Sequence, residues 1–333
     1  MEHCVNLART AGPTRRELLI GAASALLVPA AARAQAFPSK PLRVIAAGPA
    51  GATADLVARL VTEPLAKELG QTAIVEPKPG AAGAIAVSDL MQSPHDGHTL
   101  LVAVSSLVSE VPHMVKLRMD MRKELQPVAE LAAGGLVLVG HPGFPAKNLA
   151  ELVAYVKANP GKVNYASPGN GSPHHLAMEM FKVRTGTFIT HIPYRGAAPA
   201  MADVMGGQVP CMFLDLASGL SIMQSNKVRV LAIGSGARSK LLPNVPTLAE
   251  VGVPNTEVFA FQGILGPANL SPAVVTKLNG DLNKAFGTPT VQKRFEDFGM
   301  EAMPGTPAQF AALSRAESKR WGPIIKQAGI KLD

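Results

Sequence analysis

Residues 165–176, with the sequence Tyr165-Ala-Ser-Pro-Gly-Asn-Gly-Ser-Pro-His-His-Leu176, decide how the chain is interpreted. A short strand ends at Ser167, two glycines let the backbone turn, and a helix begins near Ser172-Pro173, where proline suits a first-turn position. The N–H groups that open a helix, together with the hydroxyls of Ser167 and Ser172, predict a binding site for a carboxylate or phosphate. A plain capped turn between a strand and a helix is the alternative that this stretch alone leaves open.

The same strand-turn-helix pattern occurs earlier and recurs along the chain. Residues 42–46 form an apolar run, residues 47–53 a Gly-rich loop, and residues 55–69 a helix whose apolar face we place at Leu56, Leu60 and Val61. Further strands are expected at 72–75, 98–104, 136–139, 163–165, 188–192, 209–213, 228–233 and 258–265, and further helices at 83–91, 149–158, after 172, 199–205, 218–224, 272–285, 290–298 and 307–328. This alternation predicts an α/β protein with parallel sheets flanked by helices.

Composition narrows the class of protein. The chain has 333 residues, of which 47% are hydrophobic and 17% charged, so we expect a globular protein of about two domains. The formal net charge is +8, and the residues before Gln35 contribute +2 of it through four arginines and two glutamates. No dense Lys/Arg run is present, which argues against a nucleic-acid partner, whereas a mild positive charge suits a small anionic ligand.

The N-terminus predicts a signal peptide over residues 1–36. A twin arginine at Arg15-Arg16 precedes a short apolar segment, and an Ala-x-Ala site places cleavage near Ala34 or Ala36. We therefore expect a periplasmic protein, with export by the twin-arginine or by the general secretory route both open. No later stretch has the ~20 apolar residues of a transmembrane helix.

The sequence lacks the patterns of a disulfide, a metal site and a dinucleotide-binding site. Removing the signal peptide removes Cys4 and leaves Cys211 alone, which excludes an internal disulfide and indicates a buried strand residue. His175 and Glu179 lie four residues apart on one predicted helix, but no third ligand is evident, so we expect no metal site. The pair Gly169-x-Gly171 lacks the remaining features of a dinucleotide site, and we expect no cofactor.

A series of short motifs resembles the solute-binding receptors of tripartite tricarboxylate transporters, the Bug family, over essentially the whole chain after the signal peptide. The motifs, in order, are Glu76-Pro-Lys-Pro-Gly80, Asp96-Gly-His-Thr-Leu100, Pro160-Gly-Lys162, Ser167-Pro-Gly-Asn-Gly-Ser172, Pro193-Tyr-Arg-Gly196, Asp215 and Pro243-Asn-Val-Pro-Thr-Leu-Ala-Glu250. The resemblance implies a two-lobed periplasmic binding protein of type II, each lobe a mainly parallel sheet flanked by helices. Lobe 1 would comprise residues 37–137 and 260–333, and lobe 2 residues 138–259.

The resemblance also implies a function without catalysis. A monomeric receptor would hold a small carboxylated solute between its lobes and deliver it to the permease subunits in the membrane. The implied ligand-binding residues are Gly48, Gly51, Ala52, Thr53, Ser105 and Ser106 in lobe 1, and Ser167, Gly169, Asn170, Gly171, Ser172, His175, Tyr194 and Asp215 in lobe 2. Family members commonly have a proline-aromatic pair where this chain has Ala47-Gly48, so the identity of the solute does not transfer from any relative.

Two of these residues could have a structural role instead of a binding role, and two other functions remain possible. Asp215 lines the pocket or caps the following helix, and Tyr194 either contacts the solute or is a half-buried ring. A periplasmic hydrolase would use Ser172, a histidine and Asp215, but the Gly-x-Ser-x-Gly motif of such enzymes is missing. A receptor that signals to a sensor protein would have the same binding site as a transport receptor.

Overall fold

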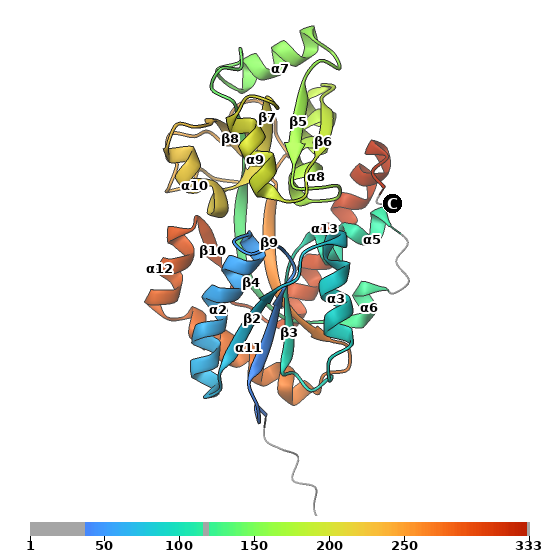
Figure 1. Cartoon of the computed structure of the whole chain (residues 1–333), viewed down its shortest axis with the longest axis vertical. Coiled ribbons are helices and arrows are strands. Elements are labelled where there is room, and N and C mark those ends of the chain that lie inside the picture. Colours follow the sequence, from blue (N-terminus) through green and yellow to red (C-terminus); the bar gives the residue numbers. More distant parts are fainter. Residues whose placement is uncertain (1–36, 116–119, 332–333) are drawn as a thin grey trace, which may run out of the picture. The chain divides into compact units, whose positions relative to one another are not determined.

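In the described part of the chain, ten strands fall into two groups (Figure 1). The computed structural model describes residues 37–115 and 120–331, so the predicted signal peptide lies outside the described residues. Residues from Lys40 onward form one unit, and the arrangement below concerns this unit.

The first group of strands is centred on three parallel strands. Strand β1 (Leu42–Ala46) lies between β2 (Ala73–Pro77) and β3 (Thr99–Val104) and runs parallel to both. Strands buried on both faces have nearly continuous apolar sequences, as β1 and β3 do. Strand β9 (Phe259–Pro267) pairs antiparallel with β3 and joins this group to β4 (Leu125–Gly140).

The second group contains β5 (Asn164–Ser167), β6 (Thr190–Pro193), β7 (Cys211–Asp215) and β8 (Arg229–Ile233). Strand β5 runs parallel to β6 and β7, while β4 pairs antiparallel with β7 and β8. The short strand β10 (Met300–Ala302) pairs antiparallel with the first part of β4. Cys211 is fully buried in β7, as its apolar neighbours predict.

Strand β4 belongs to both groups. It pairs with β9 between Leu125 and Gly135 and with β7 between Leu136 and Gly140, and Figure 1 shows β4 and β9 side by side where they connect the two groups. Every pairing of β4 or β9 is antiparallel, whereas β1 with β2 and β3, and β5 with β6 and β7, are parallel. The fold is therefore the expected α/β type, in which helices connect the parallel strands and β4 and β9 add antiparallel pairings.

The helices alternate with the strands as the sequence predicts. The longer ones are α2 (Thr53–Leu69), α3 (Ala84–Met91), α7 (Leu149–Ala158), α8 (Pro173–Thr185), α9 (Ala197–Met205), α10 (Leu216–Gln224), α11 (Pro272–Phe286), α12 (Pro289–Asp297) and α13 (Pro307–Ala328). Three four-residue helices that we did not predict precede β4: α4 (Ser106–Ser109), α5 (Val111–Met114) and α6 (Met121–Glu124). None of the helices in the described part of the chain is long and apolar enough to span a membrane.

The buried face of α2 agrees with the predicted one at Val61 and differs at the other two residues. Val57, Val61 and Leu65 are fully or almost fully buried, whereas Leu56 and Leu60 are only half-buried. Both sets of residues have helical spacing, and the contact of α2 with β1, β2 and β3 selects the first set.

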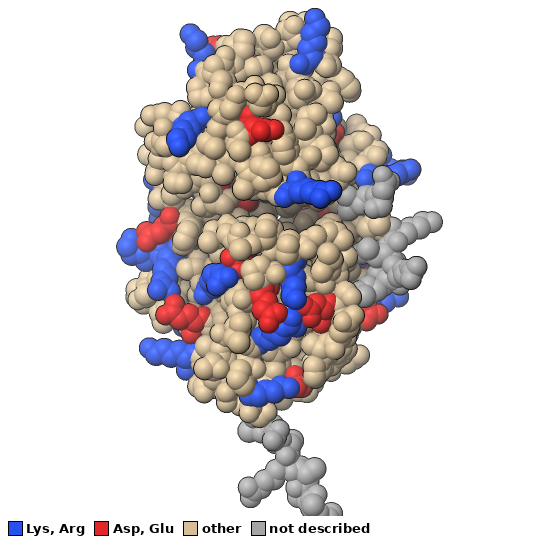
Figure 2. All heavy atoms as spheres, in the orientation of Figure 1, with Lys and Arg blue, Asp and Glu red and all other residues tan. Residues whose placement is uncertain are grey.

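The core extends along both groups of strands. One cluster combines Tyr165 of β5 and Phe181 of α8 with Trp321 and Ile325 of α13, so the C-terminal part of α13 packs on elements of the second group. On the face shown in Figure 2, basic and acidic side chains are interspersed among uncharged ones.

Candidate ligand-binding site

The loop between β1 and α2 begins at the buried end of β1. The Gly48 amide donates to the Ala46 carbonyl at 2.8 Å, and the Ala52 amide donates to the Pro49 carbonyl at 3.1 Å. Gly51 has a φ of +77°, which favours glycine, and its amide donates to Asp55 Oδ2 at 2.9 Å. Asp55 therefore fixes this loop from inside the helix.

Helix α2 begins at Thr53 without a side-chain cap. Thr53, Ala54 and Asp55 are 7%, 3% and 3% exposed, and among the described residues no hydrogen-bond acceptor is found for their backbone amides. Buried helix amides normally have a partner, and the positive end of the helix dipole favours an anion. This end of α2 is therefore suited to bind a carboxylate.

Ser105 and Ser106 follow β3 and are both buried. The Ser105 amide donates to the Phe261 carbonyl at 2.8 Å, and its own carbonyl accepts from the Ser109 hydroxyl at 2.6 Å. These bonds fix the backbone of the turn beside β9.

The turn between β5 and α8 is stabilised by hydrogen bonds of Ser172. Gly171 has a φ of +72°, and the Ser172 hydroxyl donates to the Gly169 carbonyl at 2.8 Å and accepts from the His175 amide at 3.3 Å. Ser172 is therefore the N-cap of α8, the local role that the sequence left open. Asn170 lies exposed at the tip of this turn.

Ser167 and His175 lie in a buried stack of rings behind the turn. The fully buried Ser167 hydroxyl lies 2.6 Å from Nε2 of His191, whose ring stacks on His175 at 3.9 Å and on Tyr165 at 4.8 Å. The Gly171 amide donates to His175 Nδ1 at 3.1 Å. Burial lowers the pKa of His175 to about 4 and that of His191 to about 3, so both rings are neutral at pH 7.

The carboxylate of Glu179 completes this stack. It accepts from the Tyr165 hydroxyl at 2.7 Å and pairs with Lys182 Nζ at 2.7 Å, while His175 Nε2 lies 3.9 Å away. Tyr165 and Lys182 thus already use the carboxylate that a metal at His175 would need. No group of three metal-ligating side chains is found in the part of the chain that the structure describes.

Asp215 joins the two groups of strands. From the end of β7 its Oδ2 accepts from the Thr53 hydroxyl at 3.0 Å and lies 3.2 Å from His174 Nε2, with 15% of the side chain exposed. Burial raises the pKa of Asp215, but the nearby His174 and the hydrogen bond from Thr53 outweigh it and leave the pKa below its ordinary value. Asp215 is therefore an ionised acceptor at the N-terminus of α2.

The Tyr194 hydroxyl donates to Asp203 Oδ2 at 2.6 Å within the second group. Burial and this bond raise the pKa of Tyr194 to about 12. Its half-buried ring packs on the core of this group.

Gln262 is a site residue that the sequence analysis missed. It lines a hollow of about 10 Å³ together with Thr53 and Asp215, and it is 1% exposed. A glutamine in the otherwise apolar strand β9 is the signal that was available. The structure thus brings together Thr53, Asp215 and Gln262, whereas Ser167 and His175 lie in the stack behind the α8 turn.

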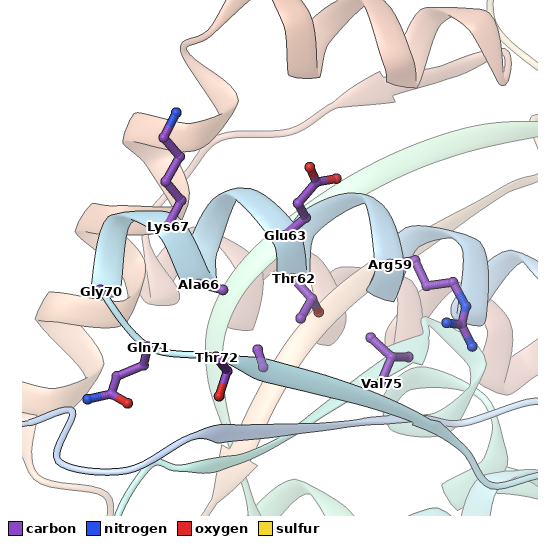
Figure 3. Close-up of a pocket in the computed structure, with 10 residues that line it drawn as sticks. Arg59, Thr62, Glu63, Ala66, Lys67, Gly70, Gln71, Thr72 and Val75 are labelled. Carbon is purple, nitrogen blue, oxygen red and sulfur yellow. The ribbon is translucent and has the colours of Figure 1, made fainter.

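A larger hollow of about 680 Å³ lies elsewhere, along α2 and the loop leading into β2 (Figure 3). Arg59, Glu63 and Lys67 of α2 and Gln71 after it are among its lining residues, and none of the predicted site residues is. Of the predicted residues, Thr53 and Asp215 line the small hollow, so we place the candidate site there.

The residues of the hydrolase alternative do not form a catalytic relay. Ser172 uses its hydroxyl to cap α8, His175 accepts from Gly171, and Asp215 contacts His174 instead. A serine nucleophile needs a histidine base that is itself oriented by the acid. These contacts do not activate Ser172 as a nucleophile.

The fold, with two groups of strands connected by β4 and β9, is that of an α/β binding protein. The family model described as tripartite tricarboxylate transporter family receptor matches residues 57–330, and the chain belongs to this family. It is 33% identical over 301 residues to BugT of Bordetella pertussis, covering 90% of this chain and 92% of BugT. These findings confirm the resemblance, the α/β periplasmic binding protein fold and a solute-binding receptor rather than an enzyme.

Two solved structures with ligands are similar over nearly their whole length. Rpa4515 of R. palustris with adipate has a TM-score of 0.83 at 28% identity and covers 89% of this chain and 99% of its own. MatC from Rhodopseudomonas palustris with bound malate has a TM-score of 0.80 at 29% identity and covers 87% of this chain and 100% of its own. Carboxylates are thus ligands of structurally similar proteins.

Proposed function

We propose that this receptor binds a small carboxylated solute at the N-terminus of α2 and delivers it to the permease subunits of a tripartite tricarboxylate transporter. The observation that carries the proposal is the set of buried amides of Thr53, Ala54 and Asp55, which have no acceptor among the described residues. A carboxylate oxygen supplies the missing acceptor, and its charge is stabilised by the helix dipole.

The remaining predicted residues surround this anchor in the proposal. Gly48, Gly51 and Ala52 shape the loop before α2, and Ser105 and Ser106 form the turn after β3. From the second group of strands, Asp215 contacts Thr53, and the α8 turn with Gly169, Asn170, Gly171 and Ser172 lies beyond β5. The part of the site that the second group of strands supplies is positioned by the contacts of Ser167, His175 and Tyr194 described above.

Binding involves a hinge motion in this proposal. The hollow at Asp215 measures about 10 Å³, room for about one water molecule, so a solute enters only when the bond between Thr53 and Asp215 opens. We place the hinge where β4 and β9 connect the two groups of strands, at the boundary between lobe 1 (37–137 and 260–333) and lobe 2 (138–259). The mature protein is a monomer in the periplasm, cleaved near Ala34 or Ala36.

Thermal unfolding against a panel of carboxylates tests the anchor. A ligand at 100 times its dissociation constant adds about 2.7 kcal/mol to the stability of the folded state. Thr53→Pro removes the first helix amide at a position where proline is tolerated, and Thr53→Val keeps that amide and the shape of the side chain. Both variants lose the Thr53 hydroxyl, so their difference isolates the amide.

We expect Thr53→Pro to bind the stabilising carboxylate at least about tenfold more weakly than Thr53→Val, because a hydrogen bond to a charged group contributes about 1.5–3 kcal/mol. Equal affinities would refute the role of the α2 amides. If no carboxylate shifted the unfolding temperature of the unmodified protein, the proposed solute class would be wrong.

A further inference from the structure

Gln262 has a buried side-chain amide without a hydrogen bond. It lies in the middle of β9, where its backbone is paired with Val104 of β3 and Ala132 of β4. The residue is 1% exposed, and neither Oε1 nor Nε2 has a partner among the described residues. Buried amides are almost always satisfied, so an unsatisfied one requires an explanation.

The hollow beside Gln262 is small enough to limit which chemical group can fill it. Its lining includes Thr53 and Asp215, and its volume of about 10 Å³ accommodates one oxygen-sized group. Asp215 is ionised and can only accept hydrogen bonds, whereas the Gln262 amide both donates and accepts. A hydroxyl group matches both residues, because it donates to Asp215 and accepts from Gln262 Nε2.

We propose that Gln262 and Asp215 form a subsite for a hydroxyl group of the solute, so that the receptor selects hydroxycarboxylates over carboxylates without a hydroxyl. This inference rests on the proposed function, in which the α2 amides hold the carboxylate. The hydroxyl donates to the carboxylate of Asp215 and accepts from Gln262 Nε2. Thr53 belongs to both the anchor and the hollow, which places the hydroxyl within a few bonds of the carboxylate.

Other substituents fit this subsite less well. A second carboxylate is repelled by Asp215 at close range. An ammonium group can donate to Asp215 and to Gln262 Oε1, but it leaves Gln262 Nε2 without an acceptor. A methylene group leaves the Gln262 amide unpaired, and a site built to bond a hydroxyl rejects the analogue without it by a large factor.

The test measures dissociation constants by calorimetry for pairs of acids that differ by one hydroxyl. Suitable pairs are succinate and malate, butanoate and 3-hydroxybutanoate, and adipate and 3-hydroxyadipate. We expect the full-length mature protein to bind the hydroxylated acid at least tenfold more tightly in a pair that binds. Gln262→Met, which has a similar volume and no amide, should bring this ratio close to one.

Gln224→Met is the matched control, because Gln224 is exposed at the end of α10 and should leave the ratio unchanged. If carboxylates bind but the unmodified protein shows no hydroxyl preference, the subsite is refuted and the proposed function stands. A preference retained by Gln262→Met also refutes the subsite. If no acid of the panel binds, the proposed function fails and the subsite fails with it.

Discussion

Glu110 should make the protein less stable as the pH rises from 5 to 8. The residue is 2% exposed next to α4, and burial raises the pKa of its carboxyl to about 8 from an ordinary value of 4.5. Ser109 Oγ lies 2.7 Å from Glu110 Oε2 and opposes the shift, while Glu317 of α13 increases it and Arg320 decreases it. The folded state therefore retains a proton that the unfolded state releases.

The sign and size of the effect follow from this difference. An acid whose folded pKa is raised is stabilised below its unfolded pKa, and this stability is lost as the pH rises toward the folded pKa. At 1.36 kcal/mol per pKa unit, the loss between pH 5 and pH 8 is about 3 kcal/mol. Glu110→Gln keeps an acceptor for Ser109 without a titrating group, so its stability relative to the unmodified protein should increase by about this amount over the same range.

Denaturant unfolding at pH 5, 6, 7 and 8, followed by the fluorescence of Trp321, measures this difference. Trp321 is the sole tryptophan of the sequence and lies buried on α13. Glu130→Gln is the graded control, because burial raises the pKa of Glu130 to about 7, so its effect should level off about one pH unit earlier. A difference between Glu110→Gln and the unmodified protein that stays constant with pH would refute a protonated Glu110.

Two further substitutions test the ring stack and the core. A base whose pKa is lowered in the folded state destabilises that state as the pH falls, and His191 is such a base. His191→Gln should therefore reduce the slope of unfolding free energy against pH by about 1.4 kcal/mol per pH unit between pH 6 and pH 4, which corresponds to about one proton. Unfolding titrations with an unchanged slope would contradict this. Gly263→Ala should destabilise the protein by about 2 kcal/mol, since its Cβ would lie 2.0 Å from Phe310 Cζ. Gly280→Ala in α11, where a Cβ meets nothing within 4 Å, should be neutral or stabilising, and equal melting temperatures for the two alanine variants would disprove the overlap with Phe310.

The sequence was sufficient for most elements of the fold. Helices such as α7 and α13 begin and end where predicted, because Asn148 and Thr306 are side-chain caps that local sequence reveals. Strand β4 was recognised only after residue 135, because Pro127 and two adjacent glycines obscure its first part and the ladder to β9 shifts register twice. The antiparallel pairing of β4 and β9 likewise depends on contacts between distant segments.

The candidate site likewise has features that the sequence predicts and features that depend on packing. Local sequence identified the turns before α2 and α8, because glycines with positive φ and a capping serine leave a pattern along a few residues. It also predicted a ligand-binding role for the Ser167 hydroxyl, which the structure places in a buried contact with His191. Which polar group faces a ligand and which faces the core depends on packing, and packing leaves little trace in one chain segment.

By itself, the sequence determined the alternation of strands and helices, the glycine-containing turns before α2 and α8 and the resemblance to tricarboxylate-transporter receptors, since each depends on residues close together in the chain. Only the tertiary structure joined Thr53 of α2 to Asp215 of β7 and placed the unpaired amide of Gln262 beside them. These residues come from three elements far apart in the sequence, and their proximity is fixed by the pairing of β4 and β9 across the two groups of strands.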